Sequence, residues 1–212
     1  MISEPVYLFS LSSHPLATSV NSLDITLFKP SIDFSQYDYF ILTSKQAVQA
    51  LKQYDKASYI HKGAVAISAA TAKSYEAIGG AVLEQGEGYG DNLEAIIKKY
   101  DKSLKWLYIR AKEIASDFAK NCREDGYNIE EVVAYESRCS QAIEEVSLPS
   151  QAVLIFTSPS SVKCFLQHHT ILPTHRVIVI GKTTAKALPQ GVKCELPMQK
   201  SIDSCLELLF IK

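Results

Sequence analysis

Two short runs place hydroxyl side chains where a strand gives way to a helix. Thr43-Ser44-Lys45 follows an apolar run, and Ser158-Pro159-Ser160 follows another. Ser and Thr are favoured as helix N-caps, and the first amides of a helix have no partner within it. Such free amides, together with the helix dipole, attract anions. These residues therefore predict anion-binding turns, although a Ser or Thr at a helix start can also serve only as a cap.

The same elements occur twice along the chain. Residues 42–48 parallel residues 156–162 at an offset of 114, and residues 65–73 parallel residues 178–186 at an offset of 113. The second pair aligns Thr71 with Thr184, which follows Thr183. Two matches at nearly one offset indicate two domains with the same local plan. Each domain should then present two anion-binding turns, and the duplication favours a shared ligand cleft.

Short apolar runs rich in β-branched residues alternate with segments of helical spacing. This alternation predicts parallel sheets covered by helices, with ligands outside the carboxyl ends of the strands. We expect strands at 6–10, 25–28, 39–43, 64–67, 81–83, 106–110, 131–135, 153–156, 177–180 and 192–195. Gly79-Gly80 and Gly126 follow helical stretches, where a left-handed C-terminal residue is favoured.

Composition excludes several classes of protein. The net charge is −1, so no basic surplus indicates nucleic acid or an anionic membrane surface. No apolar run approaches the length of a membrane span. The start of the chain, residues 1–5, has no basic residue before an apolar segment and does not resemble a secretory leader. The five cysteines include no Cys-x-x-Cys pair, which predicts reduced thiols in a cytoplasmic protein, without disulfides or a metal site.

The ordered set of motifs resembles the uroporphyrinogen-III synthases. Residues 156–160, Phe-Thr-Ser-Pro-Ser, resemble the family's FTSP turn, and residues 42–44 resemble its partner in the other domain. Residues 179–185 are similar to the family's IGxTTA segment. The segment from 107–110 to 133–136 is similar to the strand, helix and strand that lead into a VYxT ending. The resemblance covers nearly the whole chain in register.

The resemblance implies two similar parallel-sheet α/β domains joined by a two-stranded connector. One domain would comprise residues 1–27 and 140–212, the other residues 34–131, and the connector residues 28–33 and 132–139. The family's substrate is hydroxymethylbilane, a linear tetrapyrrole with eight carboxylates. The reaction loses water, inverts the last pyrrole ring and closes the macrocycle. It uses no metal and no organic cofactor.

The resemblance also implies roles for individual residues. Tyr135 matches the family's tyrosine, and a phenol that stays protonated at neutral pH can donate to the departing hydroxyl. A packed aromatic residue with a surface hydroxyl is the alternative. Arg110 could pair with a substrate carboxylate or with Glu113. The expected catalytic residues are Tyr135 and Thr184, and the expected substrate-binding residues are Thr43, Ser44, Lys45, Thr71, Arg110, Ser158, Ser160 and Thr183.

Two functions remain open at this point. The first is the cyclising lyase, a cytoplasmic monomer that would make at most a transient contact with the preceding enzyme of its pathway. The second is a non-catalytic two-domain sensor of tetrapyrroles or other polyanions, because a fold does not fix a function. Neither function requires nucleic acid or a membrane.

Overall fold

The chain divides into two compact units. The computed structural model describes residues 4–88, 90–114 and 116–210. Unit 1 comprises the described residues up to Asp24 and from Arg138 onward, and unit 2 comprises Ile25–Ser137. The expectation of no secretory leader rests partly on residues 1–3, which lie outside the described residues.

Unit 1 is built on a four-stranded sheet of strand order β10-β9-β1-β2, in which all neighbouring strands are parallel. Its strands are β1 (Val6–Ser10), β2 (Thr18–Asn21), β9 (Val153–Phe156) and β10 (Arg176–Val179). Its helices are α6 (Gln141–Glu145), α7 (Pro159–His168), α8 (Lys182–Ala185), α9 (Ile202–Glu207) and the 3-10 helix η2 (Leu208–Phe210).

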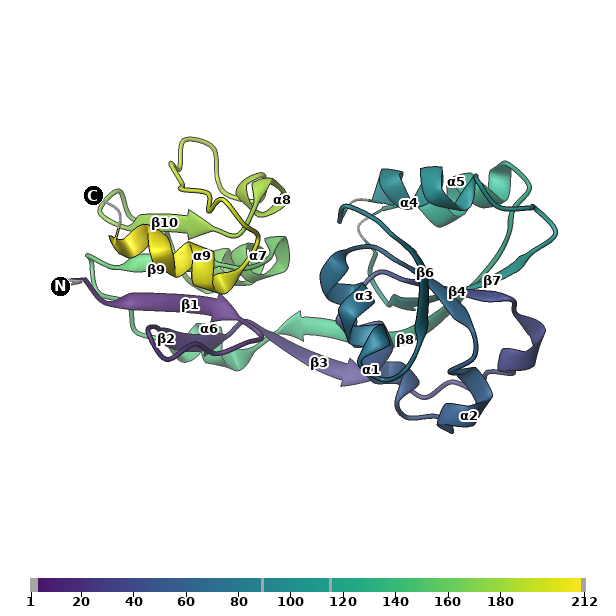
Figure 1. The fold of residues 1–212 in the computed structure, drawn as a ribbon. Helices are drawn as coiled ribbons and strands as arrows, with labels where there is room; N and C mark the ends of the chain where they lie inside the picture. The colour runs from purple at the N-terminus through teal and green to yellow at the C-terminus, as the bar shows by residue number, and fades with distance from the viewer. Residues whose placement is uncertain (1–3, 89, 115, 211–212) are drawn as a thin grey trace. The chain divides into compact units, whose positions relative to one another are not determined.

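Side chains that alternate along the strands of unit 1 form a core on each face of its sheet. Leu8 and Ile155 pack with Leu206 of α9 on one face. Phe9 packs on the other face with Phe156 and with Phe165 of α7. Figure 1 shows α9 and α7 on opposite sides of the strands. This arrangement is what a parallel sheet buried on both faces requires.

Unit 2 contains most of a six-stranded sheet of order β3-β8-β7-β4-β5-β6. The strands β4 to β8 pair in parallel. The bounds are β3 (Leu23–Leu27), β4 (Tyr39–Leu42), β5 (Gly63–Ala66), β6 (Ala81–Gln85), β7 (Lys105–Ala111) and β8 (Asn128–Cys139). The helices are η1 (Phe34–Gln36), α1 (Lys45–Leu51), α2 (Lys56–Tyr59), α3 (Ala69–Glu76), α4 (Gly90–Ile97) and α5 (Phe118–Glu124).

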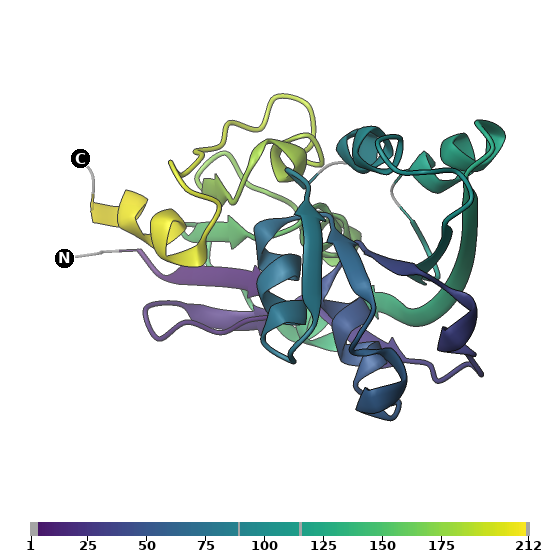
Figure 2. The same cartoon turned by 45° about the vertical axis from the view of Figure 1, so that its right-hand side comes forward.

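The helices of unit 2 also cover both faces of its sheet. Phe40 and Leu42 of β4 pack with α1 and α3, whereas Ile41 packs with α4 and α5. Figures 1 and 2 show α1 beside α3 and α4 beside α5. The predicted α/β class with parallel sheets is therefore confirmed.

Local sequence signals mark many of the helix ends. Ser44, Ser68, Ser158 and Ser201 each cap a helix with a side-chain oxygen that accepts a backbone amide. Gly79 and Gly126 follow helices with φ of 95° and 89°, which confirms the expected left-handed ends.

The sequence repeat is also a structural repeat. The amide of Ile67 donates to the carbonyl of Leu42 at 2.9 Å in unit 2, and the amide of Ile180 donates to that of Phe156 at 3.0 Å in unit 1. In both units the hydrogen bond joins the end of one strand to the turn that leaves its parallel neighbour. The two turns of each unit therefore lie at the same edge of a sheet.

The structure differs from the expected strands at two places. Residues 192–195 form no strand, and their pairing is a single bridge between Ile178 and Glu195. Strand β2 was not expected, because Thr18–Asn21 is mostly exposed and lacks an apolar pattern.

The expectation of reduced thiols without disulfides is wrong for two cysteines. Cys139 and Cys164 form a disulfide, with their Cα atoms 5.3 Å apart, within the range for bridged cysteines. The remaining cysteines, Cys122, Cys194 and Cys205, are free. The disulfide was not predicted because its two cysteines are 25 residues apart and meet only when α7 packs beside the end of β8.

Phe9 should be a main source of stability in unit 1. It is fully buried, and its ring centroid lies 5.0 Å from those of both Phe156 and Phe165. We expect Phe9→Ala to lower the free energy of unfolding by about 3–5 kcal/mol, measured by urea denaturation with circular dichroism. Phe210→Ala is the matched control, because Phe210 is 64% exposed. Equal losses for the two variants would contradict this role of Phe9 in the core.

Candidate functional site

Four hydroxyl groups meet at the carboxyl end of β4 in unit 2. The Thr43 hydroxyl lies 3.3 Å from that of Tyr108, and the hydroxyls of Thr43 and Ser44 lie close enough to the Tyr135 hydroxyl to lower its pKa. Tyr108 and Tyr135 belong to the packing clusters on opposite faces of the sheet. Their hydroxyls therefore converge on the strand end from both sides. We call Thr43, Ser44, Tyr108 and Tyr135 the hydroxyl cluster.

Burial sets the proton affinity of the two tyrosines. Tyr135 is 5% exposed and Tyr108 is 3% exposed. Burial raises the pKa of both phenols, and the hydrogen bonds from Thr43 and Ser44 offset this only in part. Both therefore keep their protons at neutral pH and act as hydrogen-bond donors or acceptors. Thr43 and Ser44 are only partly buried, so the cluster approaches the surface of unit 2 at these two residues.

The two helix starts of unit 2 leave different amides available. Ser44 accepts the amide of Gln46 at 3.1 Å, which leaves the first-turn amide of Lys45 without an acceptor in its helix. In the next turn, the amide of Thr71 donates to Ser68, and the Thr71 and Ser68 hydroxyls lie 3.3 Å apart. The first-turn donors left for a ligand there are the amides of residues 69 and 70, rather than the Thr71 groups.

In unit 1, a chain of serine hydroxyls holds the start of α7. Ser158 accepts the amide of Ser161 at 3.0 Å, and their hydroxyls lie 2.8 Å apart. The buried Ser22 hydroxyl lies 2.9 Å from that of Ser161. Because Pro159 has no N–H, the first-turn amide that these contacts leave for a ligand is that of the exposed Ser160.

The start of α8 offers more free amides. Gly181 precedes the helix and has no side chain to accept them, so the first-turn amides of Lys182, Thr183 and Thr184 have no acceptor in the helix. Thr183 is exposed, whereas Thr184 is 2% exposed. Strands β9 and β10 are parallel neighbours, so this turn lies at the same edge as the α7 turn.

Arg110 is held within unit 2. Its Nε lies 2.5 Å from a Glu131 carboxylate oxygen, and its Nη1 donates to the carbonyls of Ala111 and Lys112. Arg123 contacts the other oxygen of Glu131, also at 2.5 Å. The ion pair is thus with Glu131 rather than with Glu113, and a substrate carboxylate would have to compete with it.

The predicted site residues therefore fall into groups. Thr43, Ser44 and Tyr135 come together in the hydroxyl cluster, and Lys45 is exposed next to it. Thr71 lies in the neighbouring turn of the same unit. Ser158, Ser160, Thr183 and Thr184 occupy the two neighbouring turns of unit 1. Sequence reasoning missed Tyr108 and Ser22, because Tyr108 lies within an apolar strand pattern and Ser22 belongs to no motif.

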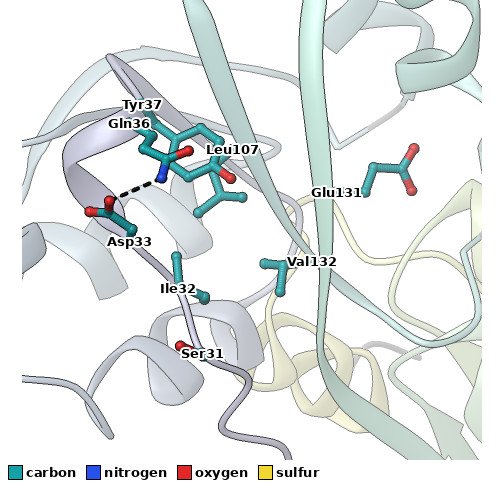
Figure 3. Close-up of a pocket in the computed structure, with 8 residues that line it drawn as sticks. All are labelled: Ser31, Ile32, Asp33, Gln36, Tyr37, Leu107, Glu131 and Val132. Atoms are coloured by element: carbon teal, nitrogen blue, oxygen red, sulfur yellow. Dashed lines mark hydrogen bonds between the residues drawn. The ribbon is translucent and has the colours of Figure 1, made fainter.

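A cavity of about 430 Å³ lies elsewhere in unit 2. Its lining residues are Ser31, Ile32, Asp33, Gln36, Tyr37, Leu107, Glu131 and Val132. Figure 3 shows Asp33 hydrogen-bonded to Gln36, with the Glu131 carboxylate on the other side. The lining holds two acidic side chains and no basic one, which disfavours a polyanion, although Glu131 is itself paired with Arg110 and Arg123. None of the predicted site residues lines the cavity.

Two further searches cover only the described part of the chain. It contains no group of three or more His, Cys, Asp or Glu side chains arranged to hold a metal ion. Among its helices, none has both the length and the apolar character needed to cross a bilayer.

The raised pKa of Tyr135 gives a testable pH dependence. Below its unfolded pKa of 10.0 the phenol is protonated in both states, and above it only the folded state keeps the proton. Tyr135 therefore contributes stability that is lost as the pH rises through its folded pKa. Above pH 10, the free energy of unfolding should fall more steeply with pH for the unsubstituted chain than for Tyr135→Phe, measured by urea denaturation. Equal slopes of the free energy of unfolding against pH in the two chains would contradict a raised pKa of Tyr135.

Comparisons with known proteins identify the family. The family model described as "Uroporphyrinogen-III synthase HemD" matches residues 13–207. The crystal structure of uroporphyrinogen-III synthetase from Helicobacter pylori 26695 is similar with a TM-score of 0.79 and 25% identity, covering 98% of both chains.

A mutant uroporphyrinogen III synthase from the extremely thermophilic bacterium Thermus thermophilus has a TM-score of 0.63 at 15% identity and shares the fold, covering 91% of this chain and 87% of that one. No match was found among curated protein sequences. Two findings agree with the duplicated turns described above. The family model matches most of the chain, and the H. pylori structure is similar over nearly its whole length. The chain belongs to the uroporphyrinogen-III synthase family of cyclising lyases in haem and porphyrin biosynthesis.

Proposed function

We propose that the chain converts hydroxymethylbilane to uroporphyrinogen III, with loss of water and inversion of the last pyrrole ring. The observation that carries this proposal is the family match over residues 13–207. The H. pylori likeness over 98% of both chains supports it. No feature of the described residues favours the non-catalytic sensor.

In this proposal, backbone amides form many of the hydrogen bonds that bind the substrate carboxylates. The turns before α1 and α3 offer first-turn amides in unit 2, and those before α7 and α8 offer them in unit 1. An amide stabilises a carboxylate without burying a countercharge, whose desolvation would offset part of the gain. Lys45 and Lys182 are exposed beside these turns and add long-range attraction.

Tyr135 assists the departing hydroxyl of the substrate. Its raised pKa makes it a weak acid, so we assign it hydrogen-bond donation rather than complete proton transfer. Thr43 and Ser44 orient the phenol, and Tyr108 in turn contacts Thr43. The electron-rich pyrrole donates electron density as the bond to the departing hydroxyl breaks, so no strong base is needed. Thr184 would contribute by its place in the first turn of α8, where the amides have no acceptor within the helix.

The remaining parts of the proposal concern organisation. The chain would work as a cytoplasmic monomer that receives its substrate in a transient contact with the preceding enzyme. Its two domains would be joined by a two-stranded connector at residues 28–33 and 132–139. The neighbouring strands β3 and β8 each contribute residues to both units, which supports a two-stranded connection, and the chain passes between the units at Asp24–Ile25 and Ser137–Arg138.

The activity and the role of Tyr135 can be tested together. Freshly made hydroxymethylbilane should give the type III isomer with the unsubstituted chain, and only the spontaneous type I isomer would contradict the proposed function. Tyr135→Phe should lower turnover roughly tenfold to a hundredfold, because the donor is lost while substrate positioning remains.

Tyr127→Phe is the matched control for this test. Tyr127 is also buried in unit 2, but its hydroxyl donates to the carbonyl of Lys98 at 3.0 Å. It precedes β8 by one residue and lies eight residues, or about 26 Å of extended chain at about 3.3 Å per residue, from Tyr135. Turnover by Tyr127→Phe should be unchanged. Unaltered turnover by Tyr135→Phe would refute the role of its hydroxyl.

The role of a backbone amide can be separated from that of a side-chain charge at Lys45. Lys45→Pro removes the first-turn amide, and the helix should persist because Pro159 occupies the equivalent position of α7. The loss of one hydrogen bond to a carboxylate should raise KM roughly tenfold.

Lys45→Ala removes the charge and keeps the amide, so KM should rise a fewfold at most, in line with the small energies of exposed charges. Circular dichroism checks that both variants keep their helices. Equal KM values for the two variants would show that the Lys45 amide does not bind substrate.

A further inference from the structure

The disulfide joins two segments that matter for the proposed function. Cys139 is the last residue of β8 and lies one residue after the chain enters unit 1 at Arg138. Cys164 belongs to α7, the helix whose first turn carries Ser158 and Ser160. The bond therefore fixes this helix to the segment by which the chain enters unit 1.

Beside the disulfide, Ser22 links the same two segments through hydrogen bonds. The carbonyl of Ser22 accepts the amide of Ser140, the residue after Cys139, at 3.3 Å. The Ser22 hydroxyl contacts that of Ser161, one helical turn before Cys164, at 2.9 Å. Ser161 in turn meets the cap Ser158. A change at the disulfide would therefore be transmitted directly to the turn proposed to bind carboxylates.

The two bridged cysteines differ in access to solvent. Cys139 is partly exposed, whereas Cys164 is 3% exposed. The buried free cysteines are unsuited to exchange, since burial raises the pKa of both Cys122 and Cys205 to about 11. Cys139 is thus the sulfur through which a small thiol or disulfide can enter.

We propose that Cys139 and Cys164 form a reversible redox pair, and that the disulfide form holds the α7 turn in the geometry that binds substrate carboxylates. The consequence for substrate rests on the proposed function. In a cytoplasmic protein a disulfide is usually transient and redox-sensing rather than a permanent support. The reduced form would leave α7 held by the core packing of Val162 and Phe165, with the hydrogen bonds of Ser22 and Ser158 at its first turn.

Exchange with a low-molecular-weight disulfide such as oxidised glutathione balances the reaction. The Cys139 thiolate attacks one sulfur of the small disulfide, forms a mixed disulfide and expels one small thiol. The Cys164 thiolate then attacks the Cys139 sulfur, closes the internal bond and expels the second small thiol. The two protein thiols lose two electrons, which reduce the small disulfide to two thiols. Their two protons pass to solvent or to the departing thiolates.

The test poises the full chain in buffers of reduced and oxidised glutathione. Each sample is quenched with acid, denatured and alkylated with N-ethylmaleimide, and intact mass gives the number of free thiols. We expect five alkylated cysteines in the reduced chain and three in the oxidised chain, since Cys122, Cys194 and Cys205 are free. Five thiols in every buffer would overturn the proposal, and this readout does not depend on activity.

The second readout is KM for hydroxymethylbilane in the two states. KM should be at least about fivefold lower for the oxidised chain, the lower end of typical coupling between sites. Cys139→Ser should show the high KM in both buffers, as should Cys164→Ser once circular dichroism verifies its fold. Cys194→Ser, which removes a free thiol of the same unit, should respond to the buffers like the unsubstituted chain.

The outcomes separate the two proposals. A disulfide that forms without any change in KM would overturn the redox control while leaving the activity intact. An equal loss of the response in Cys194→Ser would overturn the assignment to the Cys139–Cys164 pair. Failure to make the type III isomer in either buffer would instead contradict the proposed function.

Discussion

Parallel strand pairing is the constraint from which the candidate site follows. Parallel neighbours end at the same edge of a sheet, and in this chain a helix begins within three residues of the ends of β4, β5, β9 and β10. A helix that begins there has unpaired amides pointing away from the strand end. Each unit therefore presents two adjacent turns of donors at one edge, and the hydrogen bonds Ile67–Leu42 and Ile180–Phe156 fix the spacing of those turns in the same way.

This constraint explains how a chain of net charge −1 can be suited to a substrate with many carboxylates. Arg110, the one arginine among the expected site residues, is paired with Glu131 within unit 2. Apart from the exposed Lys45 and Lys182, the donors that remain at the turns are neutral amides and hydroxyls. They stabilise an anion without the desolvation that a buried cation would require. The buried tyrosines of the hydroxyl cluster fit the same principle, because their raised pKa keeps them neutral donors.

Local signals were sufficient to predict the α/β class, the repeat and the helix caps. The serines that cap α1, α3 and α7 lie in the duplicated segments, and Gly79 and Gly126 end helices as their position indicated.

Features that depend on tertiary packing were not predictable. Tyr108 joins the hydroxyl cluster only because β7 lies beside β4, and Ser22 meets Ser161 across 139 residues of sequence. The same holds for the disulfide, whose cysteines approach each other only when α7 packs beside the end of β8. Residues 192–195 had the composition of a strand but make only a single bridge to β10.

The central claim is that the free first-turn amides bind the carboxylates, and amide chemical shifts test it most directly. Isotope-labelled chain would be titrated with uroporphyrinogen III under anaerobic conditions, and the shift of every backbone amide followed. Large shifts are expected for the amides of Lys45, Ala69, Ala70, Ser160 and Thr183. Smaller shifts are expected for Gln46 and Ser161, whose amides already donate to Ser44 and Ser158. Shifts confined to the cavity lined by Asp33 and Glu131, with none at the helix starts, would contradict the claim.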